Sequence, residues 1–192
     1  MTRLIAAAAL CSTFAFAPGC CHTGKKHDGD AMHGQKEKIT HAICILSATD
    51  GNAVTGWVKF EQTAQGTRVT AEVAGLTPGL HGFHVHHLGD ISAPDGTATA
   101  GHYNPHGVDH GLPGEGEGHG HMEVGGHVGD LGNLDANAQG RATYDVTYKD
   151  LKLHFILGRS IIVHRDEDDG GQPTGNAGPR IAQGVIGIDA AE

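Results

Sequence analysis

Apolar and polar residues alternate with a period of two along much of the chain. In the segment TGWVKFEQ, Val58 and Phe60 fall on one face, and Trp57 and Lys59 fall on the other. Because successive side chains of a β-strand point to opposite faces of a sheet, this alternation predicts a strand with one buried face. Short apolar or alternating runs predict further strands at 43–48 (ICILSA), 67–76 (TRVTAEVAGL), 82–87 (GFHVHH), 141–148 (RATYDVTY), 160–165 (SIIVHR) and 184–189 (GVIGID).

Short turn signals separate the first of these segments, at Asp50-Gly51-Asn52, Gln65-Gly66 and Thr77-Pro78-Gly79. Residues of these types favour tight turns between antiparallel strands. No segment combines sustained helical spacing of apolar residues with capping residues at its ends. We therefore expect an all-β domain of antiparallel strands.

Two long segments lack the alternation, from His87 to Leu131 and from Arg165 to Arg180. Both contain proline and much glycine, and seven of the 16 residues from Gly111 to Gly126 are glycine. Long loops in a compact β domain are often functional. A loop this rich in glycine needs something to hold it, and a bound metal ion is one such clamp.

The first 19 residues have the order of an export signal, with Arg3 ahead of an apolar run that ends at Ala17. Nothing later in the chain is long and apolar enough to cross a bilayer. Two cleavage positions fit this signal peptide. Cleavage after Ala17 would give a free secreted protein, whereas APGC resembles a bacterial lipobox that would make Cys20 the lipidated residue, with Ala17 where such boxes usually have Leu. We favour the lipid-anchored form and expect export to a bacterial periplasm or cell envelope.

Residues 20–40 carry Gly, Lys, Asp and histidines without apolar periodicity, so we expect a flexible His-containing tether between the signal and a domain at 41–192. His22, His27, His33 and Met32 either capture a metal loosely or form a solvated spacer.

The chain is acidic, with a formal net charge of −9, and removal of the signal peptide, which holds one arginine and no acid, makes it −10. An exported acidic domain is a poor candidate for nucleic-acid binding. Of the four cysteines, Cys11 lies in the signal, Cys20 and Cys21 lie at its end, and Cys44 stands alone. Lipidation of Cys20 would leave two free thiols, which is unusual in an oxidising compartment.

Histidines cluster in HGFHVHHLGD. On a strand, His84 and His86 project to one side and can reach one ion together, while Val85 and His87 point the other way. Imidazole suits zinc, copper, iron and nickel. An isolated pair of this kind is about as often a surface feature as a ligand pair, so the motif alone decides nothing.

Residues downstream strengthen the case for metal. His102, His110, His127 and Asp130 supply three imidazoles and one carboxylate, a reasonable tetrahedral zinc site. His164, at the end of an apolar strand, could add a nitrogen to the strand pair and form a nitrogen-rich site with an open position, which favours copper.

The motifs GLHGFHVHHLGD, GHYNP, HVGDLGN, IIVHRDEDD and TGNAGPRIAQGVIGI occur in the order and approximate spacing of one known family. From about Ile43 to Ile188 the chain resembles copper,zinc superoxide dismutase. The resemblance implies a Greek-key β-barrel or sandwich of about eight antiparallel strands with long metal-binding loops. It also implies dismutation of superoxide to dioxygen and hydrogen peroxide, an antioxidant activity.

The resemblance further implies roles for single residues. His102 would bridge the two ions as a doubly deprotonated imidazole, lose its copper bond on reduction, and carry a proton. Asp168 would tie His84 to His110. Arg180 would attract and orient the anion; a rim salt bridge is the alternative for it. The implied copper ligands are His84, His86, His102 and His164, and the implied zinc ligands are His102, His110, His127 and Asp130.

The remaining histidines do not match ligand positions. We expect His41, His81 and His154 to pack or lie on the surface, with His81 a candidate structural donor near the loops. His87, His106, His119 and His121 are expected to be solvated, although the last two could bind extra metal.

The chain departs from the family in its loops. The family clamps its metal-bearing loop with a disulfide, but here that loop has no cysteine and Gln183 stands at the strand position. A Gln183 hydrogen bond and Pro94 are candidates for holding the loop near Arg180. The insertion before His127 is longer than in the common family pattern. The segment DDGGQPTGNAG is shorter and lacks the charged residues that many members place beside the substrate channel, so the resemblance supports dismutation more strongly than rapid electrostatic steering of the substrate.

Two other functions stay open at this point. A copper or zinc storage or delivery protein on the same fold would not need Arg180, and an adhesion sandwich would not explain the spacing of the zinc-type ligands. The sequence leaves the oligomeric state open, with a homodimer suggested only by GVIGI, which resembles a dimer-contact segment in some relatives.

Overall fold

The computed structural model describes residues 38–113 and 126–190. Its strands are β1 (His41–Ala48), β2 (Thr55–Gln62), β3 (Thr67–Ala74), β4 (Gly79–His86), β5 (Asp130–Ala136), β6 (Arg141–Tyr148), β7 (Ser160–His164) and β8 (Arg180–Ile188), with a 3-10 turn at Thr97–Thr99 and a one-turn helix α1 (Leu153–Ile156). All strand pairings are antiparallel. The all-β prediction with eight antiparallel strands is confirmed. No helix in the described ranges has the length and apolar character needed to span a membrane.

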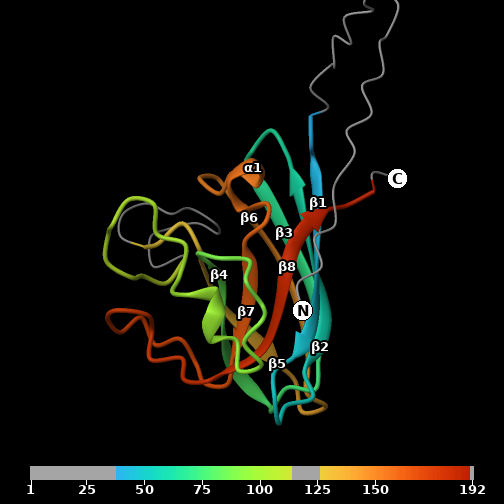
Figure 1. Cartoon of the computed structure of the whole chain (residues 1–192), viewed down its shortest axis with the longest axis vertical. Helices are drawn as coiled ribbons and strands as arrows, with labels where there is room; N and C mark the ends of the chain where they lie inside the picture. The colour runs from blue at the N-terminus through green and yellow to red at the C-terminus, as the bar shows by residue number, and fades with distance from the viewer. Residues whose placement is uncertain (1–37, 114–125, 191–192) are drawn as a thin grey trace, which may run out of the picture. The chain divides into compact units, whose positions relative to one another are not determined.

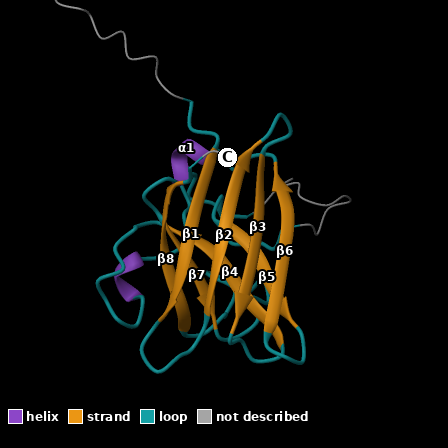
Figure 2. Cartoon of the chain, turned by 90° about the vertical axis from the view of Figure 1, so that its right-hand side faces the viewer, coloured by secondary structure: helices purple, strands orange, loops and turns teal. Residues whose placement is uncertain are grey.

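The strands form one sheet that curls into a nearly closed barrel. Their order is β5-β4-β7-β8-β1-β2-β3-β6, so several neighbours are distant in sequence, as Greek-key connections require. Figure 2 shows β1, β2, β3 and β6 on the near side, with β4, β5 and β7 behind them. At the seam between β5 and β6, the hydroxyls of Tyr144 and Tyr148 donate to the Leu131 carbonyl at 2.6 and 3.0 Å.

The core follows the alternation seen in the sequence. Val58 and Phe60 of β2 are buried, whereas Lys59 between them is exposed. Fully buried side chains such as Phe83 and Ile161 fill the barrel from the opposite side. Removal of this apolar surface from water is the main stabilising contribution to the fold.

Four elements differ most from the sequence prediction. β4 begins at Gly79, which the sequence assigned to a turn, three residues before the predicted strand at 82. β5 begins at Asp130, inside a segment predicted to be loop, and five of its seven residues are buried, so it shows no regular alternation of buried and exposed positions. β8 begins at Arg180, four residues before the predicted strand at 184. α1 has only four residues, too few to establish a helical period.

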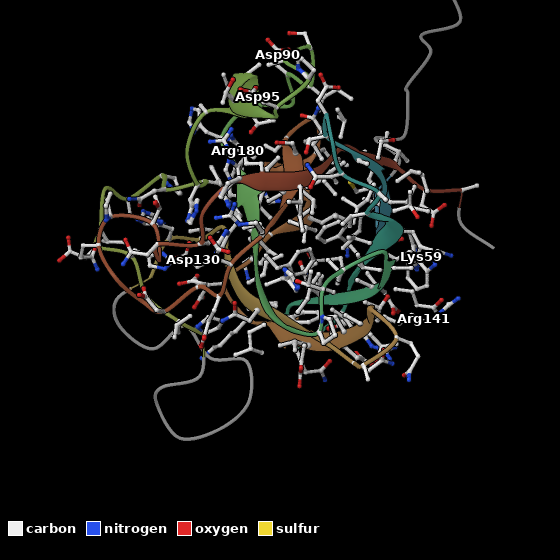
Figure 3. All side chains as sticks on the ribbon, turned by 90° about the horizontal axis from the view of Figure 1, so that it is seen from below. Lys59, Asp90, Asp95, Asp130, Arg141 and Arg180 are labelled. Atoms are coloured by element: carbon white, nitrogen blue, oxygen red, sulfur yellow. The ribbon has the colours of Figure 1, made fainter. Side chains whose placement is uncertain are left out.

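The described parts of the two long loops lie on the same side of the barrel. Figure 1 shows the segment after β4 and the segment between β7 and β8 on this side. Figure 3 shows Arg180 and Asp130 on the loop-bearing side, with Lys59 and Arg141 on the opposite side. The fold therefore gathers the predicted site residues at one place.

Candidate metal centre

The predicted ligands form two clusters. In each cluster one potential ligand atom per residue lies within 4.8 Å of all the others, and every residue is buried. The strand cluster is His84, His86, His102 and His164, and the loop cluster is His102, His110, His127 and Asp130. His102 belongs to both.

Pairing between strands builds the strand cluster. His84 and His86 alternate along β4, and β4 pairs with β7, whose last residue is His164. A register shift between Gly82 and His84 marks a bulge just before the ligands. The backbone of His102 forms an isolated antiparallel bridge with His86, which brings the loop residue to the strand pair.

Each imidazole of the strand cluster uses one nitrogen for a protein partner. His86 Nδ1 lies 2.9 Å from the Ala100 carbonyl, and His164 Nδ1 lies 3.0 Å from the Gly178 carbonyl. His84 instead uses Nε2, so its buried Nδ1 has no hydrogen-bond partner. The Nε2 atoms of His86 and His164 are 3.4 Å apart. Partners of this kind fix ring orientation and leave the second nitrogen free for a metal.

The loop cluster has the dimensions of a tetrahedral zinc site. His127 Nδ1 lies 3.3 Å from His102 Nδ1, and His102 Nδ1 lies 2.8 Å from Asp130 Oδ1. His110 Nδ1 lies 2.8 Å from Asp130 Oδ2 yet makes no hydrogen bond of acceptable geometry. Zinc–nitrogen bonds of about 2.0 Å place tetrahedral ligands about 3.3 Å apart, so the donor set fits this ion.

Asp168 links the clusters, as the family resemblance implied. Its carboxylate lies 2.7 Å from His84 Nε2 and 2.8 Å from His110 Nε2. Asn133 holds the Asp168 backbone, accepting from its N–H at 2.8 Å and donating to its carbonyl at 2.9 Å. Gly175 has φ +77, and a Cβ there would overlap the Asp168 carboxylate. The sequence analysis did not identify either support. The available signals were a glycine at position 175 and an asparagine in the motif HVGDLGN.

Burial sets the charge states of the strand cluster. It lowers the pKa of His84 to about 4 and that of His164 to about 3, and it lowers the pKa of His86 well below its ordinary value. These rings are therefore neutral at pH 7, the form that binds a metal.

The loop cluster and Asp168 concentrate negative charge. Burial alone would raise the pKa of Asp130 and Asp168, but hydrogen bonds with histidines hold both values below the ordinary range. Burial also lowers the pKa of His110, yet the adjacent carboxylates of Asp130 and Asp168 raise it to about 9. In the metal-free protein, a proton on His110 therefore compensates the negative charge of the two carboxylates, a role that a bound metal cation could take.

Arg180 lies at the start of β8, opposite His164 in the sheet register. Its guanidinium donates to the Thr99 hydroxyl at 2.9 Å and to the carbonyls of Gly96 and Ala100. Burial lowers its pKa, but a guanidinium stays charged at neutral pH. A positive group therefore stands beside the strand cluster.

The other histidines lie outside both clusters. His81 is buried, with Nδ1 3.0 Å from the His164 carbonyl and Nε2 2.8 Å from the Thr77 carbonyl. His87, His106 and His154 are exposed, and His41 is half-buried. The predicted lipidation site Cys20, the tether histidines and metal-binding candidates His119 and His121 lie outside the described residues.

The family described as copper/zinc superoxide dismutase (SODC) matches residues 54–186. The chain belongs to this family. Superoxide dismutase [Cu-Zn] of Onchocerca volvulus is 42% identical over 168 residues, which cover 79% of this chain and 98% of the relative. Extracellular superoxide dismutase [Cu-Zn] of Brugia pahangi is 41% identical, with 80% of this chain and 78% of the relative covered.

A solved structure agrees with the assignment. The clock protein EA4 has 36% identity and a TM-score of 0.71, and the match covers 82% of this chain and all of that one. Family membership and the two clusters together establish the chemistry: the enzyme is an oxidoreductase that dismutates superoxide and uses copper and zinc. Both predictions from the sequence are confirmed.

Proposed function

We propose that the strand cluster binds copper, that the loop cluster binds zinc, and that His102 bridges the two ions. The donor sets support this division, because an all-nitrogen set suits copper and three imidazoles with one carboxylate suit zinc. The observation that carries the proposal is that the potential ligand atoms of each cluster are buried and lie within 4.8 Å of one another, with His102 in both clusters.

When bound, copper supplies one-electron redox chemistry, so that one superoxide ion is oxidised to dioxygen and another is reduced, with two protons, to hydrogen peroxide. Arg180 attracts and orients the anion through its fixed guanidinium. His102 has Nδ1 toward Asp130, which leaves Nε2 for the strand cluster and for holding and releasing a proton. Asp168 keeps the rings of His84 and His110 in place.

One pair of variants tests the metal assignment. His164→Ala should lose copper and at least about a hundredfold in activity while it retains zinc, since removal of a direct ligand exceeds the 10- to 100-fold effect of an outer partner. His87→Ala, an exposed neighbour of the cluster, is the matched control and should keep both metals. Full activity in His164→Ala would show the copper assignment to be wrong, and copper without turnover in the wild type would favour a carrier.

We also propose that the protein is exported for antioxidant defence in a periplasm or cell envelope. Residues 1–19 would be removed, Cys20 would carry the lipid, 20–40 would form the tether, and 41–192 the catalytic domain. The order of Arg3 and the apolar run supports export, and the names of two relatives, from Brugia pahangi and Onchocerca volvulus, include the word extracellular. A homodimer is a further proposal from GVIGI alone. The mass of the purified N-terminal peptide tests Cys20.

A further inference from the structure

The loop between β4 and His102 carries the groups that hold Arg180. Gly96, Thr99 and Ala100 supply the three oxygens that accept from its guanidinium. Two of these oxygens also serve His86, whose Nδ1 lies 2.9 Å from the Ala100 carbonyl and 3.2 Å from the Thr99 hydroxyl. A displacement of this loop would therefore move the guanidinium and turn a copper-site ring at the same time.

The outer part of the loop, residues 91–95, has little burial to hold it. Ile91, Ser92, Pro94 and Asp95 are exposed, and Ala93 is partly buried. The loop and β8 contain no cysteine, so no disulfide joins them. Among the described residues, the hydrogen bonds that reach 91–95 from the barrel come from the Asp50 N–H, to the Pro94 carbonyl at 2.9 Å, and from Gln183.

Gln183 is a buried amide in an otherwise apolar stretch of β8. Its side chain is 7% exposed, and Nε2 donates to the Ala93 carbonyl at 3.1 Å and approaches the Ile91 carbonyl at 3.5 Å. Its Oε1 has no hydrogen-bond partner. Burial of an amide is unfavourable unless its polar atoms are paired, so an incompletely paired glutamine is a poor choice for core packing alone.

We propose that Gln183 is a positioning residue: its amide fastens residues 91–93 to β8 and so holds the 96–100 segment against Arg180 and His86. Gln183 lies three residues after Arg180 on β8, so the same strand contacts the loop at two points, through the Arg180 guanidinium and through the Gln183 amide. The amide thus acts as a non-covalent clamp. The proposal rests on the roles given above to Arg180 and His86.

The first experiment measures the clamp without metal. Gln183→Met keeps the length of the side chain and removes the donor, and Ile45→Met, at an exposed position on the neighbouring strand β1, is the matched control. In metal-free full-length protein, amide exchange at Gly96, Thr99 and Ala100 should be about tenfold faster in Gln183→Met, as loss of one hydrogen bond implies, and unchanged in the control. Equal exchange in both variants would overturn the proposal.

The second experiment separates positioning from general destabilisation. Gln183→Met should lower the rate constant for superoxide decay several-fold in the wild type but not further in Arg180→Ala, because residues that act through one another are not additive. The Cu(II) electron paramagnetic resonance signal of Gln183→Met should broaden through the altered His86. An equal loss of activity in both backgrounds would overturn the proposal.

A third variant keeps the test decisive if Gln183→Met does not fold. Gln183→Leu has a similar size, and its side chain has no donor for the Ala93 carbonyl. It should show the same faster exchange, and a wild-type exchange rate would overturn the proposal. Faster exchange with unchanged activity in every background would instead contradict the role given to Arg180, while an inactive, metal-loaded wild type would contradict the proposed function.

Discussion

At the residue scale, the site depends on how each imidazole divides its two nitrogens. His86 and His164 give Nδ1 to loop carbonyls and face the cluster with Nε2, whereas His84 does the reverse because Asp168 takes its Nε2. The sequence identifies these residues as histidines but does not indicate which nitrogen is free. That choice comes from carbonyl and carboxylate groups far away in the chain.

Asp168 is the residue that most directly tests this arrangement. Asp168→Asn removes the charge and one of the two equivalent acceptors, so it cannot orient His84 and His110 together. We expect affinity for zinc and for copper to fall by about 10- to 100-fold. Competition titration with a chromophoric chelator measures both. Glu167→Gln, at an exposed neighbouring position, should keep wild-type affinity, and unchanged metal affinity in Asp168→Asn would contradict the role of this carboxylate.

The pKa values of the histidines predict the pH dependence of stability in metal-free protein. Burial lowers the pKa of His84 to about 4 and that of His164 to about 3, whereas an unfolded histidine titrates near 6.5. The stability associated with these two neutral rings is therefore present above pH 6.5 and is lost as the pH falls toward 4, at up to about 1.4 kcal/mol per pH unit for each ring.

His110 acts in the opposite direction. Its folded pKa is raised to about 9, so its contribution is present below pH 6.5 and is lost as the pH rises through 9. We expect the urea midpoint of metal-free protein to be greatest near pH 6.5. Below pH 6.5, the slope of the unfolding free energy against pH should correspond to about one proton fewer in His164→Gln than in the wild type. An equal slope in the two proteins would show that His164 does not titrate as described.

At the element scale, strands marked by regular alternation or by an unbroken apolar run, such as β2 and the fully buried β7, could be predicted from sequence, whereas β5, which has neither mark, could not. The boundaries of β2 and β6 coincide with the predicted segments because their exposed residues, such as Lys59 and Asp145, mark every second position. β5 has five buried residues among seven and a glycine at φ +78, which hides the strand pattern. Its prediction would have required knowledge of the sheet around it.

The same limit applies to the supports of the site. Strand alternation placed His84 and His86 together, and the family motifs proposed the other ligands that the structure gathers. Asn133 lies in the motif HVGDLGN, but nothing in the motif indicates its hydrogen bonds to Asp168, 35 positions away. Thr99 lies outside the motifs, and it contacts His86, 13 positions away. Contacts of that kind depend on how β5 and the loop fold over the barrel, and residue type alone does not specify them.

At the scale of the whole molecule, the net charge of the chain and the charge of its substrate have the same sign. The chain has a formal net charge of −9, so the distant field repels an anion such as superoxide. Asp90 and Asp95 lie on the same loop that holds Arg180 (Figure 3). In the mechanism proposed above, the attraction is local and comes from the guanidinium beside the strand cluster.

Stability at this scale should depend on metal and not on a disulfide. Cys44 is the one cysteine in the described ranges; it is buried and free, and burial raises the pKa of its thiol to about 12. A reductant should therefore leave the melting temperature of metal-free full-length protein unchanged. Removal of both metals should lower the melting temperature of the metal-loaded protein by about 15–30 °C, since each metal ion at 1,000 times its Kd contributes about 4 kcal/mol and each kcal/mol shifts a domain of this size by about 2–4 °C. Differential scanning calorimetry with chelator, with reductant and after restoration of copper and zinc makes the comparison. A large shift with reductant alone would show a covalent contribution to stability that these residues do not provide.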